Sequence, residues 1–143
     1  MMFDSFRARV GIILIQGRDI LLLRDTKGTP PTFFLPGGVV KLGETLEAAA
    51  KRETKTQTGV DIELSKLLYI YDNIKEDGKH RLDIFFLGKV AEEQLVVPGI
   101  QNTKLDWVRI DLLPSMNLNP LILREQILKD WKNKFKTESV YLK

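Results

Sequence analysis

The stretch FFLPGGVVKLGETLEAAAKRETKTQTGV, residues 33–60, decides how this chain folds. It opens with the apolar end of a strand, and Pro36 with the two glycines after it ends that strand and predicts a turn. From Thr45 onward come strong helix formers, with no glycine or proline before Gly59. Thr45 suits an N-cap and Gly59 suits a left-handed helix terminator. The stretch therefore predicts a strand, a glycine-rich loop and a helix in immediate succession.

Such a layout is typical of a phosphate site. Gly37 and Gly38 allow a close approach of the backbone and leave N–H groups free to face an anion, and the positive helix end adds to this. Residues three and four apart share a helix face, so Glu53, Thr56 and Gln57 lie together. Carboxylates in these places would hold Mg²⁺ and bridge it to phosphates. Glu53 is the only acid of the three.

The segment resembles the Nudix box, whose pattern is G, five residues, E, seven residues, R-E, an apolar residue, any residue, E-E, any residue, G and an apolar residue. The chain keeps this spacing without insertion or deletion. The matching residues are Gly38, Glu44, Arg52, Glu53, Gly59 and Val60. FFLPGG also resembles the family's usual entry into the loop, and residues 105–113 (LDWVRIDLL) resemble its late strand. By this resemblance the chain is identified as a member of the Nudix superfamily with a degenerate box.

The departures from the pattern fall on the metal site. Thr56 and Gln57 stand where the family has two adjacent glutamates, Thr54 stands at the apolar place, and Lys41 stands where glutamate is common. With acids at three of these places the formal charge of +3 would turn negative. The pI of about 9.1 therefore reports the altered site more than a nucleic-acid surface.

The resemblance implies an α/β (α+β) fold with a mixed sheet sandwiched between helices over residues 7–135, and we expect one domain spanning 1–143. It implies hydrolysis of a diphosphate bond in a nucleoside diphosphate derivative or nucleotide. Mg²⁺ or Mn²⁺ would be the cofactor, bound weakly because two carboxylates are missing. The alternative is a non-hydrolytic module on the same fold, which binds nucleotides or another protein.

The resemblance also implies roles for individual residues. The predicted catalytic residues are Glu53, Arg52 and Glu93; the predicted substrate-binding residues are Gly37, Gly38 and Lys41; the predicted metal ligands are Glu53, Gln57 and Glu44. Glu93, or its neighbour Glu92, follows a strand in a region where relatives often place a further glutamate. Weaker candidates for a compensating acid are Glu76, Asp77 and Asp83. In the simpler interpretation Arg52 is structural, Glu44 braces the loop, and Glu53 pairs with a surface lysine.

Composition limits the class of protein. A chain of 143 residues with 43% hydrophobic and 29% charged residues suits one globular domain. It has no cysteine, and no apolar run approaches the roughly 20 residues that span a bilayer. We therefore expect a cytoplasmic protein that binds a small nucleotide, with no membrane and no specific nucleic acid as partner. A homodimer stays open.

The remaining patterns predict a sheet and one further helix. The predicted strands cover residues 7–15, 20–23, 62–71, 81–90 and 104–110, with the first two forming a hairpin. The last helix is predicted to begin at Asn119 as cap and Pro120 as first helical residue. Its apolar stripe comprises Leu121, Leu123, Ile127, Leu128, Trp131 and Phe135. SVYL near the end of the chain predicts a short strand.

Overall fold

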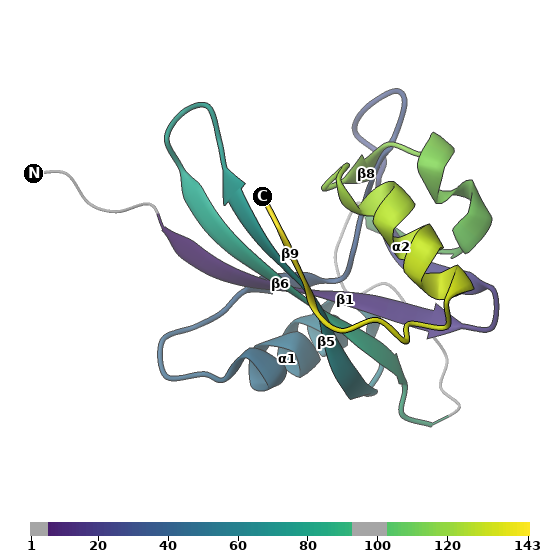
Figure 1. Ribbon diagram of the computed structural model, residues 1–143, viewed down its shortest axis with the longest axis horizontal. Coiled ribbons are helices and arrows are strands. Elements are labelled where there is room, and N and C mark those ends of the chain that lie inside the picture. The colour runs from purple at the N-terminus through teal and green to yellow at the C-terminus, as the bar shows by residue number, and fades with distance from the viewer. Residues whose placement is uncertain (1–5, 93–102) are drawn as a thin grey trace, which may run out of the picture.

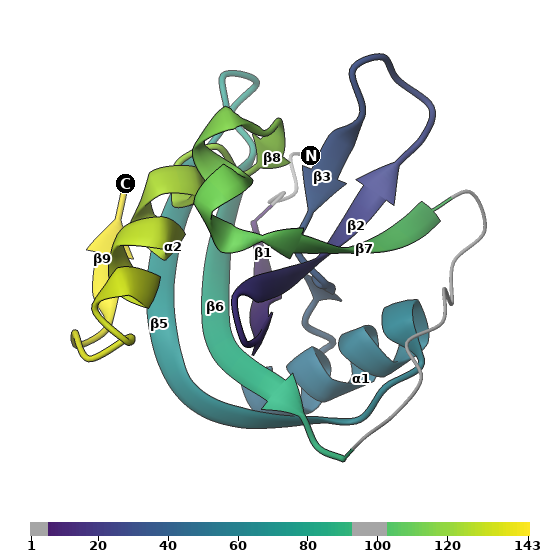
Figure 2. The same cartoon turned by 90° about the vertical axis from the view of Figure 1, so that its right-hand side faces the viewer.

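The computed structural model describes residues 6–92 and 103–143, and shows a strongly curved sheet with helices on two sides (Figures 1 and 2). Its elements in chain order are β1 (Arg7–Gln16), β2 (Asp19–Asp25), β3 (Thr32–Phe34), β4 (Gly37–Val39), α1 (Leu46–Thr58), β5 (Ile62–Ile74), β6 (His80–Val90), β7 (Thr103–Arg109), the 3₁₀ helix η1 (Ile110–Ser115), β8 (Leu118–Asn119), α2 (Leu123–Lys132) and β9 (Val140–Leu142).

The central strand β1 connects the two parts of the sheet. Within the described ranges the strand order is β8-β3-β2-β1-β6-β5-β9, with β4 beside β1 and β7 beside β2. β1 pairs in parallel with β6 over residues 7–14, but with β2 only at Ile15–Ile20 and Gln16–Asp19. The predicted hairpin is therefore confirmed at its turn, beyond which its two strands separate. Strands that are covered on both faces have continuous apolar sequences, as β1 and β2 do.

Two apolar layers lie on opposite faces of the sheet. Alternate residues of β1 point to opposite sides, so Val10, Ile12 and Leu14 pack with Ala49 and Ala50 of α1. On the other face Ile13 belongs to a cluster with residues of η1, β8 and α2, which are Ile110, Leu113, Leu118, Leu123 and Ile127. The expected mixed sheet between helices is confirmed (Figure 2).

A buried carboxylate fixes α2 to β5. Asp130 is only 2% exposed, and it accepts hydrogen bonds from the Tyr69 hydroxyl at 2.7 Å and from Gln126 Nε2 at 2.9 Å. Burial and the neighbouring Asp130 raise the pKa of Tyr69 well above its ordinary value, so this hydroxyl stays a donor. The anchor was not predicted from the sequence, although Asp130 follows Leu123 by seven residues and Ile127 by three, which places it on the buried face of the helix.

The start of the last helix was predicted wrongly. α2 begins at Leu123, whereas Asn119 belongs to β8 and pairs in parallel with Phe34 of β3. Pro120 follows that strand, and Leu121 is 56% exposed and lies outside the apolar stripe. β8 is only two residues long and pairs with a strand 85 residues earlier in the chain, so no periodic pattern in the sequence reveals it. The prediction therefore followed the helix-capping signal of Asn119 and Pro120.

Other boundaries differ less. The predicted turn at the glycine pair is the short strand β4, and the predicted strand 62–71 continues to Ile74. The short terminal strand is confirmed as β9, which pairs in parallel with β5. Trp107 and Trp131 pack against the two apolar clusters, as expected. In the described part of the chain, every helix is too short or too polar to cross a membrane.

Candidate active site

The glycine pair of β4 lies between two close neighbours. β4 runs antiparallel to β1, with Gly37 opposite Gly11 and Gly38 opposite Val10. Gly37 has a φ of +150°, and a Cβ there would lie 2.0 Å from the Val10 carbonyl oxygen. A Cβ on Gly38 would lie 2.6 Å from Cδ of Glu53. The backbone contact excludes any larger residue at Gly37, whereas a Cβ on Gly38 would displace the Glu53 carboxylate.

Helix α1 presents Glu53 to this glycine pair. The Thr45 side chain accepts the N–H of Ala48 at 3.1 Å, and Gly59 ends the helix with a φ of 79°. Both predicted caps are confirmed. Ala49 and Ala50 on the buried face pack against the sheet, and this sets the rotation of the helix. The Glu53 carboxylate consequently lies directly against Gly38.

Arg52 joins the loop to the helix. Its guanidinium binds both oxygens of Glu44, with Nε–Oε2 at 2.7 Å and Nη2–Oε1 at 2.9 Å. Its Nη1 donates to Glu53 Oε1 at 2.7 Å, and Nη2 donates to the Val39 carbonyl at 3.1 Å. Such a planar fork is the strongest common way to hold a carboxylate. One cation thereby fixes both Glu44 of the loop and Glu53 of the helix.

The same contacts lower the pKa of Glu44. The hydrogen bond from Arg52, followed by the one from the Lys41 N–H, holds the pKa of this carboxyl at about 2. In turn, the hydrogen bonds that Arg52 donates to Glu44 and Glu53 raise the pKa of Arg52 above its already high ordinary value. Glu44 is therefore ionised throughout the neutral range and fully engaged in bracing the loop.

Two of the positions that depart from the Nudix pattern, Gln57 and Thr56, bind main-chain groups. Gln57 uses its whole amide on Gly37: Nε2 donates to the carbonyl at 2.8 Å and Oε1 accepts the N–H at 2.8 Å. Thr56 is exposed, and its hydroxyl donates to the Arg52 carbonyl at 3.0 Å, one turn back. Gln57 thus satisfies the outer edge of β4, the edge that β1 does not pair.

These contacts decide how the site suits a divalent ion. Among residues 6–92 and 103–143, no group of three or more histidine, cysteine, aspartate or glutamate side chains is arranged to hold a metal. Glu53 Oε2 is the carboxylate oxygen at the glycine pair to which no described residue donates a hydrogen bond. Mg²⁺ in proteins commonly keeps several waters and takes one or two carboxylates plus substrate phosphates. The single open carboxylate oxygen of Glu53 fits an ion that is held mainly by water and substrate phosphates. It does not fit an ion that is held by protein ligands alone.

A polar cleft of about 130 Å³ opens beside Gly37. Arg9 of β1 and Arg81 and Asp83 of β6 line it, together with Asn119 of β8. Asp83 is 6% exposed and accepts from Asn73 at Oδ2, but its Oδ1 has no partner among the described residues, and neither has Arg81 Nε. A buried acceptor and a buried donor without partners mark a place that a polar ligand can complete.

The structure brings most of the predicted residues together. Glu53, Arg52, Glu44, Gln57, Gly37 and Gly38 form one contiguous cluster, and Lys41 lies on the adjoining loop with its side chain exposed. Their roles as catalytic groups, substrate contacts or ligands stay predictions. Glu93 lies outside the described residues. The cleft residues Arg9 and Asn119 were missed, and Asp83 faces the cleft, although it was considered only as a compensating acid.

A signal for the cleft exists in the sequence. Arg81, Asp83 and Phe85 alternate with apolar residues along RLDIFF, which places two charged side chains on one face of an interior strand. A charge buried in the middle of a sheet needs a partner or a purpose. Asn119 left no comparable signal, because its position depends on the two-residue strand β8.

Comparison with known proteins identifies the family. The model of the NUDIX domain matches residues 5–130, so the chain belongs to the NUDIX family. It is 32% identical over 127 residues to the ADP-ribose pyrophosphatase of Methanocaldococcus jannaschii, covering 86% of this chain and 72% of that one. It is also 32% identical over 123 residues to the putative 8-oxo-dGTP diphosphatase of Bacillus subtilis, covering 85% of this chain and 76% of the relative.

Solved structures agree on the fold. A NUDIX hydrolase from Nitrosomonas europaea superposes with a TM-score of 0.77 at 18% identity, covering 98% of this chain and 78% of that one. The MutT NUDIX hydrolase from Burkholderia pseudomallei gives a TM-score of 0.72 at 25% identity, covering 85% and 96% respectively. The curved mixed sheet with its flanking helices is therefore the fold of this family.

Proposed function

We propose that this chain is a hydrolase that cleaves a diphosphate bond in a nucleotide or nucleoside diphosphate derivative. The observation that carries the proposal is the placement of the Glu53 carboxylate, which lies against Gly38 with Oε1 held by Arg52 at 2.7 Å. One oxygen is thereby fixed while the other faces no described donor. A positioned carboxylate with an open oxygen is what a general base or a metal ligand requires.

The adjoining cleft supplies features for binding the substrate. Arg9 and Arg81 offer cationic groups for phosphate oxygens, and guanidinium groups suit phosphates well. Asp83 Oδ1 would accept a hydrogen bond from a base N–H or a sugar hydroxyl. Phe34 lines the same cleft and offers an aromatic surface for a base. Lys41, on the loop after β4, is proposed as a further phosphate contact.

Each residue of the glycine-loop cluster then has a stated task. Glu53 would take a proton from the attacking water or serve as a ligand of Mg²⁺ or Mn²⁺. When bound, such an ion neutralises charge on the phosphate oxygens. Arg52 fixes the orientation of Glu53, and Glu44 braces the loop through Arg52. We assign a bracing role to Gln57 as well, because its amide is occupied by the Gly37 main chain. Ion binding without substrate is expected to be weak.

The test is a substrate screen with a matched control. The purified chain is incubated with a panel of nucleoside triphosphates, sugar nucleotides and dinucleotides in Mg²⁺ or Mn²⁺, and release of phosphate or a monophosphate is measured. Glu53→Gln is compared with Glu125→Gln, which changes an exposed glutamate on α2. Turnover that disappears in Glu53→Gln and persists in Glu125→Gln supports the proposal. Turnover that survives in both variants contradicts it.

A second function is favoured by one observation. Arg52 and Gln57 already satisfy groups that would otherwise gather around an ion, so the cluster is stable without one. Such a site suits a module that binds a nucleotide without cleaving it. Calorimetric binding of a nucleotide in the presence of a chelator, with no turnover anywhere in the panel, would favour this module over the hydrolase.

A further inference from the structure

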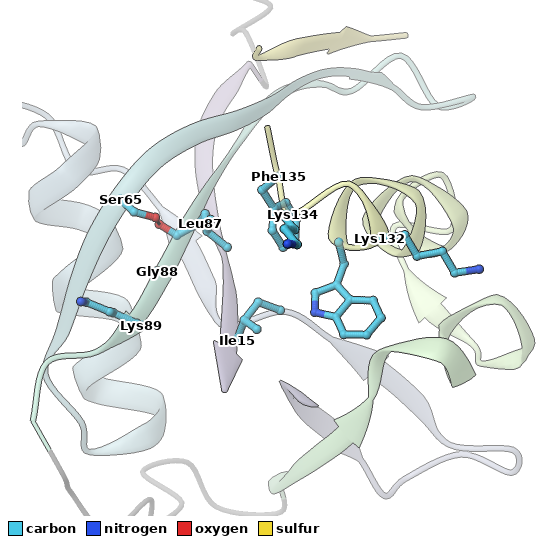
Figure 3. A pocket seen from close by; sticks show the side chains of 9 residues that line it. Ile15, Ser65, Leu87, Gly88, Lys89, Lys132, Lys134 and Phe135 are labelled. Atoms are coloured by element: carbon cyan, nitrogen blue, oxygen red, sulfur yellow. Dashed lines mark hydrogen bonds between the residues drawn. The ribbon is translucent and has the colours of Figure 1, made fainter. Parts of the chain in front are cut away.

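A second hollow lies on the face of the sheet that α2 covers, between the ends of β5 and β6 and the C-terminal end of α2 (Figure 3). It has a volume of about 630 Å³, within the range of small-molecule pockets. None of its lining residues lines the cleft beside Gly37. The hollow is therefore separate from the proposed active site.

The floor of this hollow is apolar. It is made by Ile15 of β1, Leu87 of β6, and Trp131 and Phe135 at the end of α2. Figure 3 shows Ile15, Leu87 and Phe135 approaching the hollow from three directions. Each of the four side chains also packs on the main apolar cluster, so the floor is a continuation of the core that reaches the surface.

The rim of the hollow is basic. Lys89, Lys132 and Lys134 line it, and all three are exposed. Lys89 makes an open contact of 3.6 Å with Glu63, while no acid in the described part of the chain pairs with Lys132 or Lys134. Figure 3 shows Lys89 and Lys132 leaving the hollow on opposite sides, with Lys134 between them. Three exposed ammonium groups around an apolar floor complement a ligand with an apolar body and a negative end.

Backbone irregularities border the same hollow. Lys134 and Phe135 are consecutive non-glycine residues with φ of 57° and 52°, a left-handed conformation that residues with a Cβ rarely adopt. Hydrogen bonds from Phe135 N to the Asp130 carbonyl and from Lys66 Nζ to the Phe135 carbonyl hold this turn. Across the hollow, β5 carries a bulge at Ser65. Strained turns and bulges concentrate at binding sites.

We propose that this hollow binds a small amphipathic anion, a carboxylate with an aliphatic or aromatic body. The body lies against Ile15, Leu87, Trp131 and Phe135, and the carboxylate is drawn to the lysines of the rim. The left-handed turn is what places Phe135 in the floor and Lys134 at the rim in adjacent positions. The proposal is independent of hydrolysis at Glu53, because the two sites share no lining residue.

The two tryptophans provide the test. In the ¹⁵N-labelled full chain, the indole N–H of Trp131 reports on the hollow, and that of Trp107, in the opposite apolar layer, is the internal control. The chain is titrated with octanoate and, as the matched neutral probe, with 1-octanol, in about 0.15 M salt to suppress distant charge effects. The charge reversals Lys132→Glu and Lys134→Glu are combined. Lys75→Glu with Lys79→Glu, at the β5–β6 turn, makes the same change in net charge elsewhere.

The proposal expects a saturable shift of the Trp131 resonance with octanoate and none of Trp107. The dissociation constant of octanoate should rise at least about fivefold in the Lys132 and Lys134 double variant, and stay within about twofold in the control variant. Equal binding of octanol and octanoate would overturn the proposal, as would the absence of a Trp131 shift with either. A Trp131 shift that depends on protein concentration alone would show a second copy over the hollow, and would also overturn it.

Discussion

The side-chain amide of Gln57 pairs with the main chain of Gly37 in both directions, with its Nε2 and Oε1 each 2.8 Å from their partner atom. A carboxylate at this position could accept the Gly37 N–H but would have no hydrogen for the Gly37 carbonyl. Gln57 therefore connects α1 to β4 by a pair of bonds that the glutamate of the family pattern cannot make. The departure from the pattern has a structural benefit as well as a cost in charge.

Gln57→Glu should destabilise the chain when no divalent ion is present. One hydrogen bond is lost, and a negative charge is placed against the Gly37 carbonyl, at a cost of about 1–2 kcal/mol in the free energy of unfolding. Urea unfolding at neutral pH with a chelator measures it. Gln16→Glu, an exposed position at the end of β1, is the control and should change little. Equal stability of Gln57→Glu and the parent chain would show that the amide pairing contributes nothing.

Restoring both acids of the pattern should tighten divalent-ion binding. In Thr56→Glu combined with Gln57→Glu, two carboxylates join Glu53 on one helix face, and charge attraction at this spacing is worth several kcal/mol at an effective dielectric of about 20. Isothermal calorimetry with Mn²⁺ compares the double variant with the parent chain. If the affinity does not rise, residues 56 and 57 do not face the ion.

Glu44 should make the stability of the chain depend on acid pH. Its pKa is about 2 in the folded chain against an ordinary 4.5, so its stabilisation is complete above about 4.5 and is lost as the pH falls toward 2. Glu44→Gln removes this titration. The difference in Tm between the parent chain and Glu44→Gln should be largest near neutral pH and should shrink below pH 4.5. A difference that is constant across this range would mean that Arg52 does not hold the carboxylate as described.

Tyr69→Phe should destabilise the chain strongly for so small a change. The substitution removes the hydroxyl that donates a hydrogen bond to the buried Asp130 carboxylate, and leaves the hydrogen bond from Gln126 in place. A hydrogen bond to a charged group contributes about 1.5–3 kcal/mol to stability. Tyr141→Phe is the matched control, since Tyr141 is 58% exposed and also binds an aspartate, Asp72. Urea unfolding of both variants measures the effect. Equal losses in the two would deny Asp130 its role as the anchor of α2.

Local signals predicted the elements around the site well. The Thr45 cap, the Gly59 terminator and the apolar positions of α1 all act within a few residues of one another, so their consequences can be worked out along the chain. The family resemblance implied a structural role for Arg52, but its simultaneous hold on Glu44 and Glu53 emerged only from the structure. The family resemblance supplied the layered arrangement, which no single segment specifies.

Contacts between distant residues were not predictable in the same way. Gln57 meets Gly37 across 20 positions, and the role of its amide depends on β4 being a strand with a free edge. Asn119 reaches the cleft only through its pairing with β3. Asp130 is buried because Tyr69, from β5, reaches it across the core. Each of these depends on tertiary packing that overrides the local pattern.

The ratio of kcat/KM between the parent chain and Glu53→Gln, on the best substrate of the panel in Mg²⁺, decides whether Glu53 takes part in the reaction. We expect kcat/KM of Glu53→Gln to fall by at least about 100-fold, with an unchanged circular dichroism spectrum, because the carboxylate beside Gly38 acts as base or holds the ion. A ratio within about twofold of one would contradict this expectation, since the carboxylate that the loop and Arg52 position would then take no part in the reaction.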